Sequence, residues 1–194
     1  MTFADRYKSG NTPWEINRPD RNLIKVVRET PIRPGEALDV GCGTGNNAIW
    51  LRQQGFKATG IDSNEIAIER ARDKARAAGV DCPFHLLDYM ADDIPGAPFD
   101  FVFDRGCFHH FQEHGKLDRF AAKTALVLTE GGLWLTLTGS ADETREGPGP
   151  PRLSGRQIVN AVEPFFEILS LVASHFDTDQ KVPAKSWVCL MRKR

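Results

Sequence analysis

The chain has 194 residues, with 25 Lys and Arg against 26 Asp and Glu and a formal net charge of −1 at pH 7. This length fits one domain with a sizeable core, and the balanced charge argues against a nucleic-acid or membrane partner. There is no signal peptide and no apolar run near the roughly 18 residues that span a bilayer, so we expect a cytoplasmic protein. The four cysteines lack paired metal-ligand spacing, which predicts reduced thiols and no metal site.

The first thirty residues are expected to lie outside any sheet. Residues 7–15 are rich in turn formers and carry two aromatic residues, Tyr7 and Trp14. A helix is predicted from about Pro19 or Asp20 to about Glu29, with Asp20 a plausible cap. Trp14 has two interpretations: it pins the arm by packing, or it helps to wall a bound ligand.

A glycine-rich turn follows the first predicted strand. The short apolar run 37–40 predicts a buried strand, and Gly41, Gly43 and Gly45 come next, before a helix-compatible stretch from Asn46. Glycine lets a ligand approach the backbone, and the start of the helix points amide groups toward it. The dinucleotide fingerprint would place its third glycine at position 46, which is Asn46 here.

A second strand is predicted over residues 57–61, and it ends at Asp62. A carboxylate about twenty positions after the first glycine lies beside the turn, where it can accept hydrogen bonds from both hydroxyls of a ribose. The alternative role for Asp62 is to cap the helix predicted over residues 65–78, although Ser63 or Asn64 can serve as that cap. The charged face of this helix is expected to be solvated.

Two more strands, over residues 83–87 and 100–103, are also followed by acidic residues. Ligands of open parallel sheets lie outside the carboxyl ends of the strands, so the acids at the four strand ends are expected to converge on one edge. They are Asp39, Asp62, Asp88 and Asp104.

The rest of the chain predicts a helix, a fifth strand, a loop that is mobile or faces the substrate, a short helix and a closing antiparallel pair. These elements are expected over residues 116–128, 133–138, 139–153, 154–161, 165–172 and 186–191.

The stretch Asp39-x-Gly41-x-Gly43-x-Gly45 resembles the cofactor loop of class I S-adenosylmethionine-dependent methyltransferases, and the resemblance extends over nearly the whole chain. It implies a Rossmann-like three-layer α/β/α sandwich in a single domain, residues 1–194, with residues 1–30 as a lid. The implied sheet is seven-stranded and mostly parallel, in the order 3-2-1-4-5-7-6, with an antiparallel last strand.

The resemblance implies S-adenosylmethionine as the cofactor. In the family, the acid after the third strand meets the adenine amine and a large neighbouring side chain packs on the ring, which would be Asp88 with Tyr89 or Met90. The full candidate cofactor set is Trp14, Asp39, Gly41, Cys42, Gly43, Gly45, Asn46, Asp62, Ser63, Asp88, Tyr89, Met90, Asp104, Arg105 and Gly106.

Two further motifs, Pro-Trp-Glu-Ile at residues 13–16 and Asp-Arg-Gly-Cys-Phe-His-His at residues 104–110, resemble small bacterial methyltransferases. The second also resembles thiopurine and thiol S-methyltransferases. The implied acceptor is a small molecule with a thiol or phenol nucleophile, and a phenol would benefit from a general base, for which His109 and His110 are candidates. Each histidine can also be an ordinary packing residue.

The sequence alone leaves open whether the chain transfers a methyl group, whether it uses a different cofactor, and whether it is a monomer or a dimer. The chain could bind the cofactor as a sensor or protein partner without methyl transfer, or it could be a nicotinamide-dependent oxidoreductase, which the position of Asn46 disfavours. The motif Asn/Asp-Pro-Pro-aromatic of nucleic-acid amino methyltransferases is missing after the fourth strand. A monomer or a homodimer is expected.

Overall fold

The computed structural model describes residues 2–147 and 149–194, without the side chains of residues 113 and 114. Contacts divide the chain into two compact units. The first unit is Met1–Ile94 with Asp177–Asp179, and the second is Pro95–Phe176 with Gln180–Arg194.

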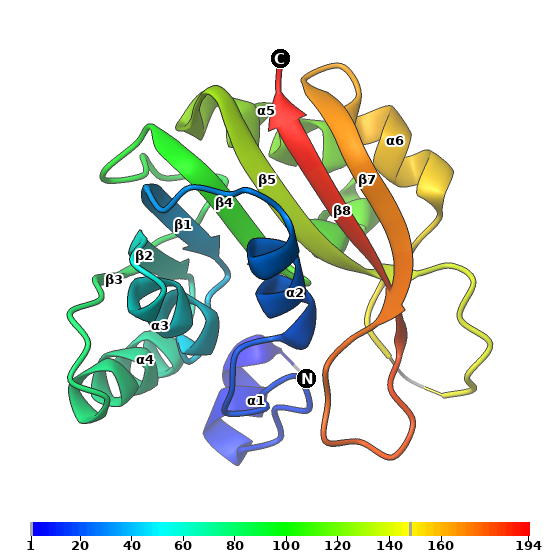
Figure 1. Ribbon diagram of the computed structural model, residues 1–194. Helices are drawn as coiled ribbons and strands as arrows, with labels where there is room; N and C mark the ends of the chain where they lie inside the picture. The colour runs from blue at the N-terminus through cyan, green and yellow to red at the C-terminus, as the bar shows by residue number, and fades with distance from the viewer. Residues whose placement is uncertain (1, 148) are drawn as a thin grey trace. The chain divides into compact units, whose positions relative to one another are not determined.

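The first unit contains three parallel strands in the order β3-β2-β1, and α3 and α4 lie side by side against them (Figure 1). Asp20 caps α2 by accepting a hydrogen bond from the amide of Asn22 (2.8 Å), as predicted. The elements are α1 (Phe3–Ser9), α2 (Arg21–Glu29), β1 (Glu36–Val40), α3 (Asn46–Gln53), β2 (Lys57–Asp62), α4 (Glu65–Ala77) and β3 (Phe84–Leu86).

The second unit contains strands in the order β4-β5-β8-β7, with a two-residue strand, β6, paired to the end of β5. β4 and β5 are parallel, and β8 is antiparallel to both of its neighbours. The elements are β4 (Phe99–Arg105), the 3₁₀ helix η1 (Phe108–His114), α5 (Leu117–Val127), β5 (Leu128–Ser140), β6 (Arg152–Leu153), α6 (Gly155–Val162), β7 (Phe166–His175) and β8 (Lys185–Lys193).

These elements confirm the Rossmann-like α/β class with a mostly parallel sheet and an antiparallel last strand. Once β6 is set aside, the orders 3-2-1 and 4-5-7-6 each appear within one unit. The additional strand β6 is a departure from the expected seven, because a two-residue strand carries no alternating pattern that a sequence could reveal. That the chain is one domain stays a prediction.

Several boundaries differ from the sequence prediction, among them those of β4 and β5. β4 continues through Asp104 and Arg105, which were expected just after it, and β5 already begins at Leu128. α1 was not predicted at all. It depends on a capping box in which Thr2 and Asp5 exchange side-chain and backbone hydrogen bonds, a local device that stabilises a helix of only seven residues.

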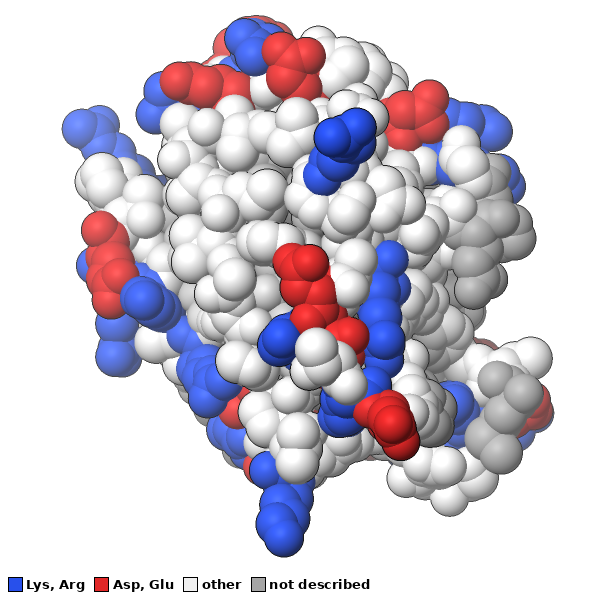
Figure 2. All heavy atoms as spheres, turned by 90° about the vertical axis from the view of Figure 1, so that its right-hand side faces the viewer, with Lys and Arg blue, Asp and Glu red and all other residues white. Residues whose placement is uncertain are grey.

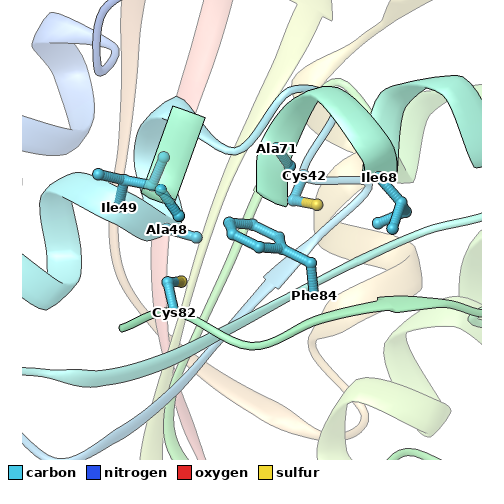
Figure 3. Close-up of a cluster of buried hydrophobic side chains, with 8 residues drawn as sticks. Cys42, Ala48, Ile49, Ile68, Ala71, Cys82 and Phe84 are labelled. Atoms are coloured by element: carbon cyan, nitrogen blue, oxygen red, sulfur yellow. The ribbon is translucent and has the colours of Figure 1, made fainter. Parts of the chain in front are cut away.

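The core of the first unit gathers around Phe84 of β3. Figure 3 shows its ring pointing between α3 and α4, close to Cys42 and Ala71. The other members of this buried cluster are Ala48, Ile49, Ile68, Ala75 and Cys82.

On the face shown in Figure 2, basic and acidic side chains alternate around a broad uncharged area. This pattern gives no single-sign field for steering a polyanion. Among the described residues, no helix is both long and apolar enough to cross a membrane.

Candidate active site

The glycine turn between β1 and α3 needs its glycines for two different reasons. Gly41, Gly43 and Gly45 all have positive φ (65°, 54° and 82°), a region that other residues rarely adopt. At Gly45 there is also no room, because a Cβ there would lie 2.7 Å from the ring of Phe84. The turn is therefore tightly seated on the core of the first unit.

Asp62 is bound to the glycine turn directly. Its Oδ2 accepts the amide of Gly43 (2.9 Å) and its Oδ1 accepts the amide of Asn64 (2.8 Å). The cap of α4 is Asn64, which accepts the amide of Ala67 (3.1 Å), so the prediction that a neighbour of Asp62 would cap this helix is confirmed. Burial raises the pKa of Asp62, and amide hydrogen bonds partly oppose that rise.

Asp39 and Cys42 face the interior. Asp39 is 1% exposed and its Oδ2 accepts the amide of Ala48 (3.1 Å) in the first turn of α3, where Gly45 offers no capping side chain. Burial raises the pKa of the Cys42 thiol well above its ordinary value. Both residues support the turn from the protein interior. Their direct contact with a cofactor stays a prediction.

The acid after β3 lies next to Asp62. The amide of Leu87 donates to the carbonyl oxygen of Asp62 (3.0 Å), which brings Asp88 to the same strand ends. Asp88 is exposed, with Oδ1 accepting the amide of Met90 (2.8 Å), whereas Tyr89 is buried. The predicted convergence therefore holds in the first unit for Asp62 and Asp88. Ser63 is exposed beside them.

The N-terminal arm reaches the glycine turn through Glu15. One carboxylate oxygen accepts a short hydrogen bond from the hydroxyl of Thr44, and the other accepts from the side-chain amide of Asn46 (2.6 Å). Burial would raise the pKa of Glu15, but hydrogen bonds from Thr44 and Asn17 and the charge of Lys74 outweigh it, so the pKa is lowered. Glu15 is thus ionised and fixed on the turn.

Lys74 of α4 completes this arrangement. Its Nζ lies 2.6 Å from Thr44 Oγ1, 3.1 Å from Asn46 Oδ1 and 3.4 Å from Glu15 Oε1. The prediction that the charged face of α4 is only solvated is therefore wrong for Lys74. The helix period identified the outer face of α4, but it could not reveal that the arm covers part of it.

Tyr7 and Trp14 bring the arm to the same place. The indole Nε1 of Trp14 donates to the hydroxyl of Tyr7 (3.2 Å), which itself lies 3.1 Å from where a Cβ on Gly43 would be. Arg70 of α4 donates to the carbonyl oxygen of Tyr7 (3.1 Å). Trp14 thus packs within the arm and is linked to the turn through the hydroxyl of Tyr7. Its contact with a cofactor stays a prediction.

Sequence reasoning missed Tyr7, Glu15 and Lys74 as partners of the glycine turn. The signal for Glu15 was present in the Pro-Trp-Glu-Ile motif, where only the tryptophan was given a role. Nothing in the local pattern marked the other two.

Asp104 in the second unit is a fully buried carboxylate. Its Oδ1 accepts the amides of Cys107 (3.1 Å) and Phe108 (2.9 Å), and its Oδ2 accepts the indole of Trp134 (3.0 Å). Burial raises its pKa to about 6, against an ordinary value of 3.8. These contacts give Asp104 a role in holding the start of η1, and a cofactor role for it stays a prediction.

Asp104 makes stability depend on pH in a defined direction. Between pH 3.8 and about 6 the folded chain holds a proton that the unfolded chain has released, so the free energy of unfolding falls as pH rises. The contribution amounts to up to about 3 kcal/mol. Urea unfolding of the wild type and of Asp104→Asn, at pH 4 and at pH 7, checks this, because the variant cannot titrate there. The stability advantage of the wild type should be smaller at pH 7; an equal advantage at both pH values would contradict the assignment.

His109 is buried, and its ring is oriented by β5. The amide of Gly139 donates to His109 Nδ1 (2.9 Å), which places the ring proton on Nε2. Burial, with the charges of His110 and Arg105, lowers the pKa of His109 well below its ordinary value. The ring is therefore neutral and presents a hydrogen-bond donor at Nε2, and a general-base role for His109 or for the exposed His110 stays a prediction.

The remaining candidates of the second unit surround this ring. Gly106 has a φ of 81°, and a Cβ there would lie 3.2 Å from His109 Nε2, so its glycine makes room for the imidazole. The guanidinium of Arg105 lies over the ring of Phe176, 5.3 Å from its centroid.

Comparison with known families and proteins agrees with this geometry. A family described as "Methyltransferase domain" matches residues 37–132, which include the glycine turn, Asp62, Asp88 and Asp104. A protein named "Probable thiol methyltransferase 2" from Arabidopsis thaliana is 29% identical over 171 residues, 86% of this chain and 74% of the relative.

Solved structures show the same fold over almost the entire chain. One, described as "Conversion of a Disulfide Bond into a Thioacetal Group during Echinomycin Biosynthesis", has a TM-score of 0.85 at 24% identity and covers 98% of this chain and 90% of its own. The Burkholderia thailandensis 1,6-didemethyltoxoflavin-N1-methyltransferase, solved with S-adenosylhomocysteine, has a TM-score of 0.76 at 21% identity, covering 98% and 85%.

Proposed function

We propose that this chain, which belongs to the class I S-adenosylmethionine-dependent methyltransferases, transfers the methyl group of S-adenosylmethionine to a small-molecule thiol or acidic phenol. The cofactor supplies a methyl carbon on a positively charged sulfur, which the acceptor displaces in line. The protein then has to align the two reactants and exclude water.

The first unit offers groups that suit this cofactor. Each oxygen of Asp62 accepts one backbone amide, and a carboxylate oxygen has a second lone pair that remains for a ribose hydroxyl. Gly41 of the turn is exposed, so its backbone is open to a ligand, and Asp88 is exposed beside Asp62 to accept from an adenine amine. We infer that these residues hold S-adenosylmethionine.

The observation that carries the acceptor class is the occupied Nδ1 of His109. With that nitrogen used by the amide of Gly139 and its proton on Nε2, this imidazole cannot take a proton from the acceptor without losing the bond. A nucleophile that ionises by itself suits such a site. A thiol with a free pKa near 8.5 supplies some thiolate at neutral pH.

Histidine variants test this choice. His109→Gln retains an acceptor for the amide of Gly139, and His110→Ala removes the exposed imidazole. If the acceptor is a thiol, both variants should keep most of the wild-type kcat, measured by formation of S-adenosylhomocysteine. If it is a phenol, His110→Ala should lose roughly a hundredfold, the usual size of a general-base effect. Methylation confined to a folded RNA or a protein side chain would contradict the proposal.

A further inference from the structure

The second unit has a shallow pocket, wide open to solvent, whose described lining contains none of the candidate site residues. Gln112 of η1 forms one part, and the other lining residues are Gly147, Gly149, Pro150, Pro151 and Arg152. Most of this lining is glycine and proline, so polar side-chain groups come from Gln112 and Arg152. These two side chains would therefore decide what the pocket accepts.

Arg152 brings a positive charge to this pocket. The side chain is half-buried, and its Nη2 donates to the backbone carbonyl oxygen of Arg145 (3.2 Å). Among the described residues, no Asp or Glu lies within ion-pair distance of it. A partly desolvated guanidinium is stabilised by a negatively charged partner. Its planar set of N–H donors matches the two oxygens of a carboxylate.

Glu143 is an acid whose pKa the charge of Arg152 helps to lower, but its carboxylate already has other hydrogen-bond partners. The pKa of Glu143 is lowered mainly by hydrogen bonds from backbone amides, with smaller contributions from the charges of Arg145 and Arg152. Its Oε1 accepts the amide of Arg145 (2.8 Å) and its Oε2 accepts the amide of Lys185 (2.8 Å). Glu143 is therefore held by the loop and by the start of β8.

The backbone of Arg152 is fixed, although the preceding segment is rich in glycine and proline. Arg152 and Leu153 form β6, which pairs with the end of β5. The carbonyl oxygen of Leu153 accepts the amide of Ala141 (2.9 Å) and the indole of Trp187 (3.0 Å), and its side chain is fully buried. The guanidinium thus projects from a rigid base, as a specific binding group should.

The pairing of β6 with β5 also links Arg152 to η1, the 3₁₀ helix that carries His109 and His110. Gly139 is the register partner of Arg152, and the amide of Gly139 is the donor to His109 Nδ1. Gln112, which also lines the pocket, follows His109 and His110 on η1. A ligand held by Arg152 would therefore lie close to the histidines.

We propose that Arg152, with Gln112, binds a carboxylate of the methyl acceptor. The acceptor is then a small organic acid whose thiol or phenol receives the methyl group. This inference rests on the proposed function and adds a recognition element to it.

A pair of matched acceptors tests the assignment. Wild-type protein should methylate 4-mercaptobenzoate with a lower KM than thiophenol. Arg152→Gln should raise the KM for 4-mercaptobenzoate by roughly 10- to 100-fold, the size expected for loss of a hydrogen bond to a charged group. The KM for thiophenol should stay unchanged, because thiophenol has no carboxylate. Arg152→Lys should recover only part of the loss. Arg156→Gln, an exposed position with the same charge change, should behave as the wild type.

A binding measurement separates this inference from the proposed function. Calorimetry with benzoate in the presence of S-adenosylhomocysteine should show binding to wild-type protein and to Arg156→Gln, but not to Arg152→Gln. Methylation of both thiols with equal KM in the wild type and Arg152→Gln would overturn the carboxylate site and leave the thiol acceptor in place. Arg152-dependent binding of benzoate with methylation of neither thiol would overturn the proposed function and retain the site.

Discussion

Gly45→Ala is expected to lower the free energy of unfolding by about 2–5 kcal/mol. The left-handed conformation of this residue costs a non-glycine residue about 1–2 kcal/mol, and forcing a methyl group into a filled core costs about 1–3 kcal/mol more. The new Cβ would lie 2.7 Å from the ring of Phe84 and 3.0 Å from the Cβ of Ala71, both of which are buried. Urea unfolding followed by circular dichroism measures the change.

Gly79→Ala is the matched control. Gly79 also has a positive φ, of 63°, but no heavy atom lies within 4 Å of the place where its Cβ would be. Its substitution should cost only the conformational part, about 1–2 kcal/mol. If both substitutions destabilised the protein equally, close packing of Gly45 on Phe84 would not be the reason for its glycine.

The backbone of this site was predictable because its signals are local. Three glycines at alternate positions after a short apolar run mark the turn, and Asp62 at the end of the next strand follows from the length of a strand-helix-strand unit. Asn64 as the cap of α4 follows from the preference of short polar residues for that position.

The side-chain partners were not predictable because they come from distant segments. Glu15 and Lys74 are separated by 59 positions and meet only once the arm folds over α4. Arg152 owes its fixed position to β6, whose pairing with Gly139 has no local signal. Asp104 was expected to follow β4 at the edge of the sheet. β4 instead continues through Arg105, and Asp104 is therefore a buried residue within the strand.

Asp62→Asn is expected to weaken binding of S-adenosylhomocysteine by about 2.5–4 kcal/mol. One of the two ribose hydroxyls loses its acceptor, which costs about 1.5–3 kcal/mol, and the other loses the charge of its acceptor, which costs about 1 kcal/mol more. The amide of an asparagine would also point a donor at the backbone amide of either Gly43 or Asn64, both of which now donate to the carboxylate. Calorimetric titration of the variant and of the wild type measures the difference.

The two roles of Asp62 can be separated, because one exists without the ligand. Loss of the bond to Gly43 or to Asn64 should lower the melting temperature of the ligand-free protein, and loss of the ribose bonds should appear only in the affinity. Asp81→Asn, an exposed position with the same charge change, should alter neither. A variant that melts earlier but binds S-adenosylhomocysteine as tightly as the wild type would make Asp62 a support of the glycine turn alone. The ribose would then have to be held by another acceptor near the strand ends, for which exposed Asp88 is the candidate.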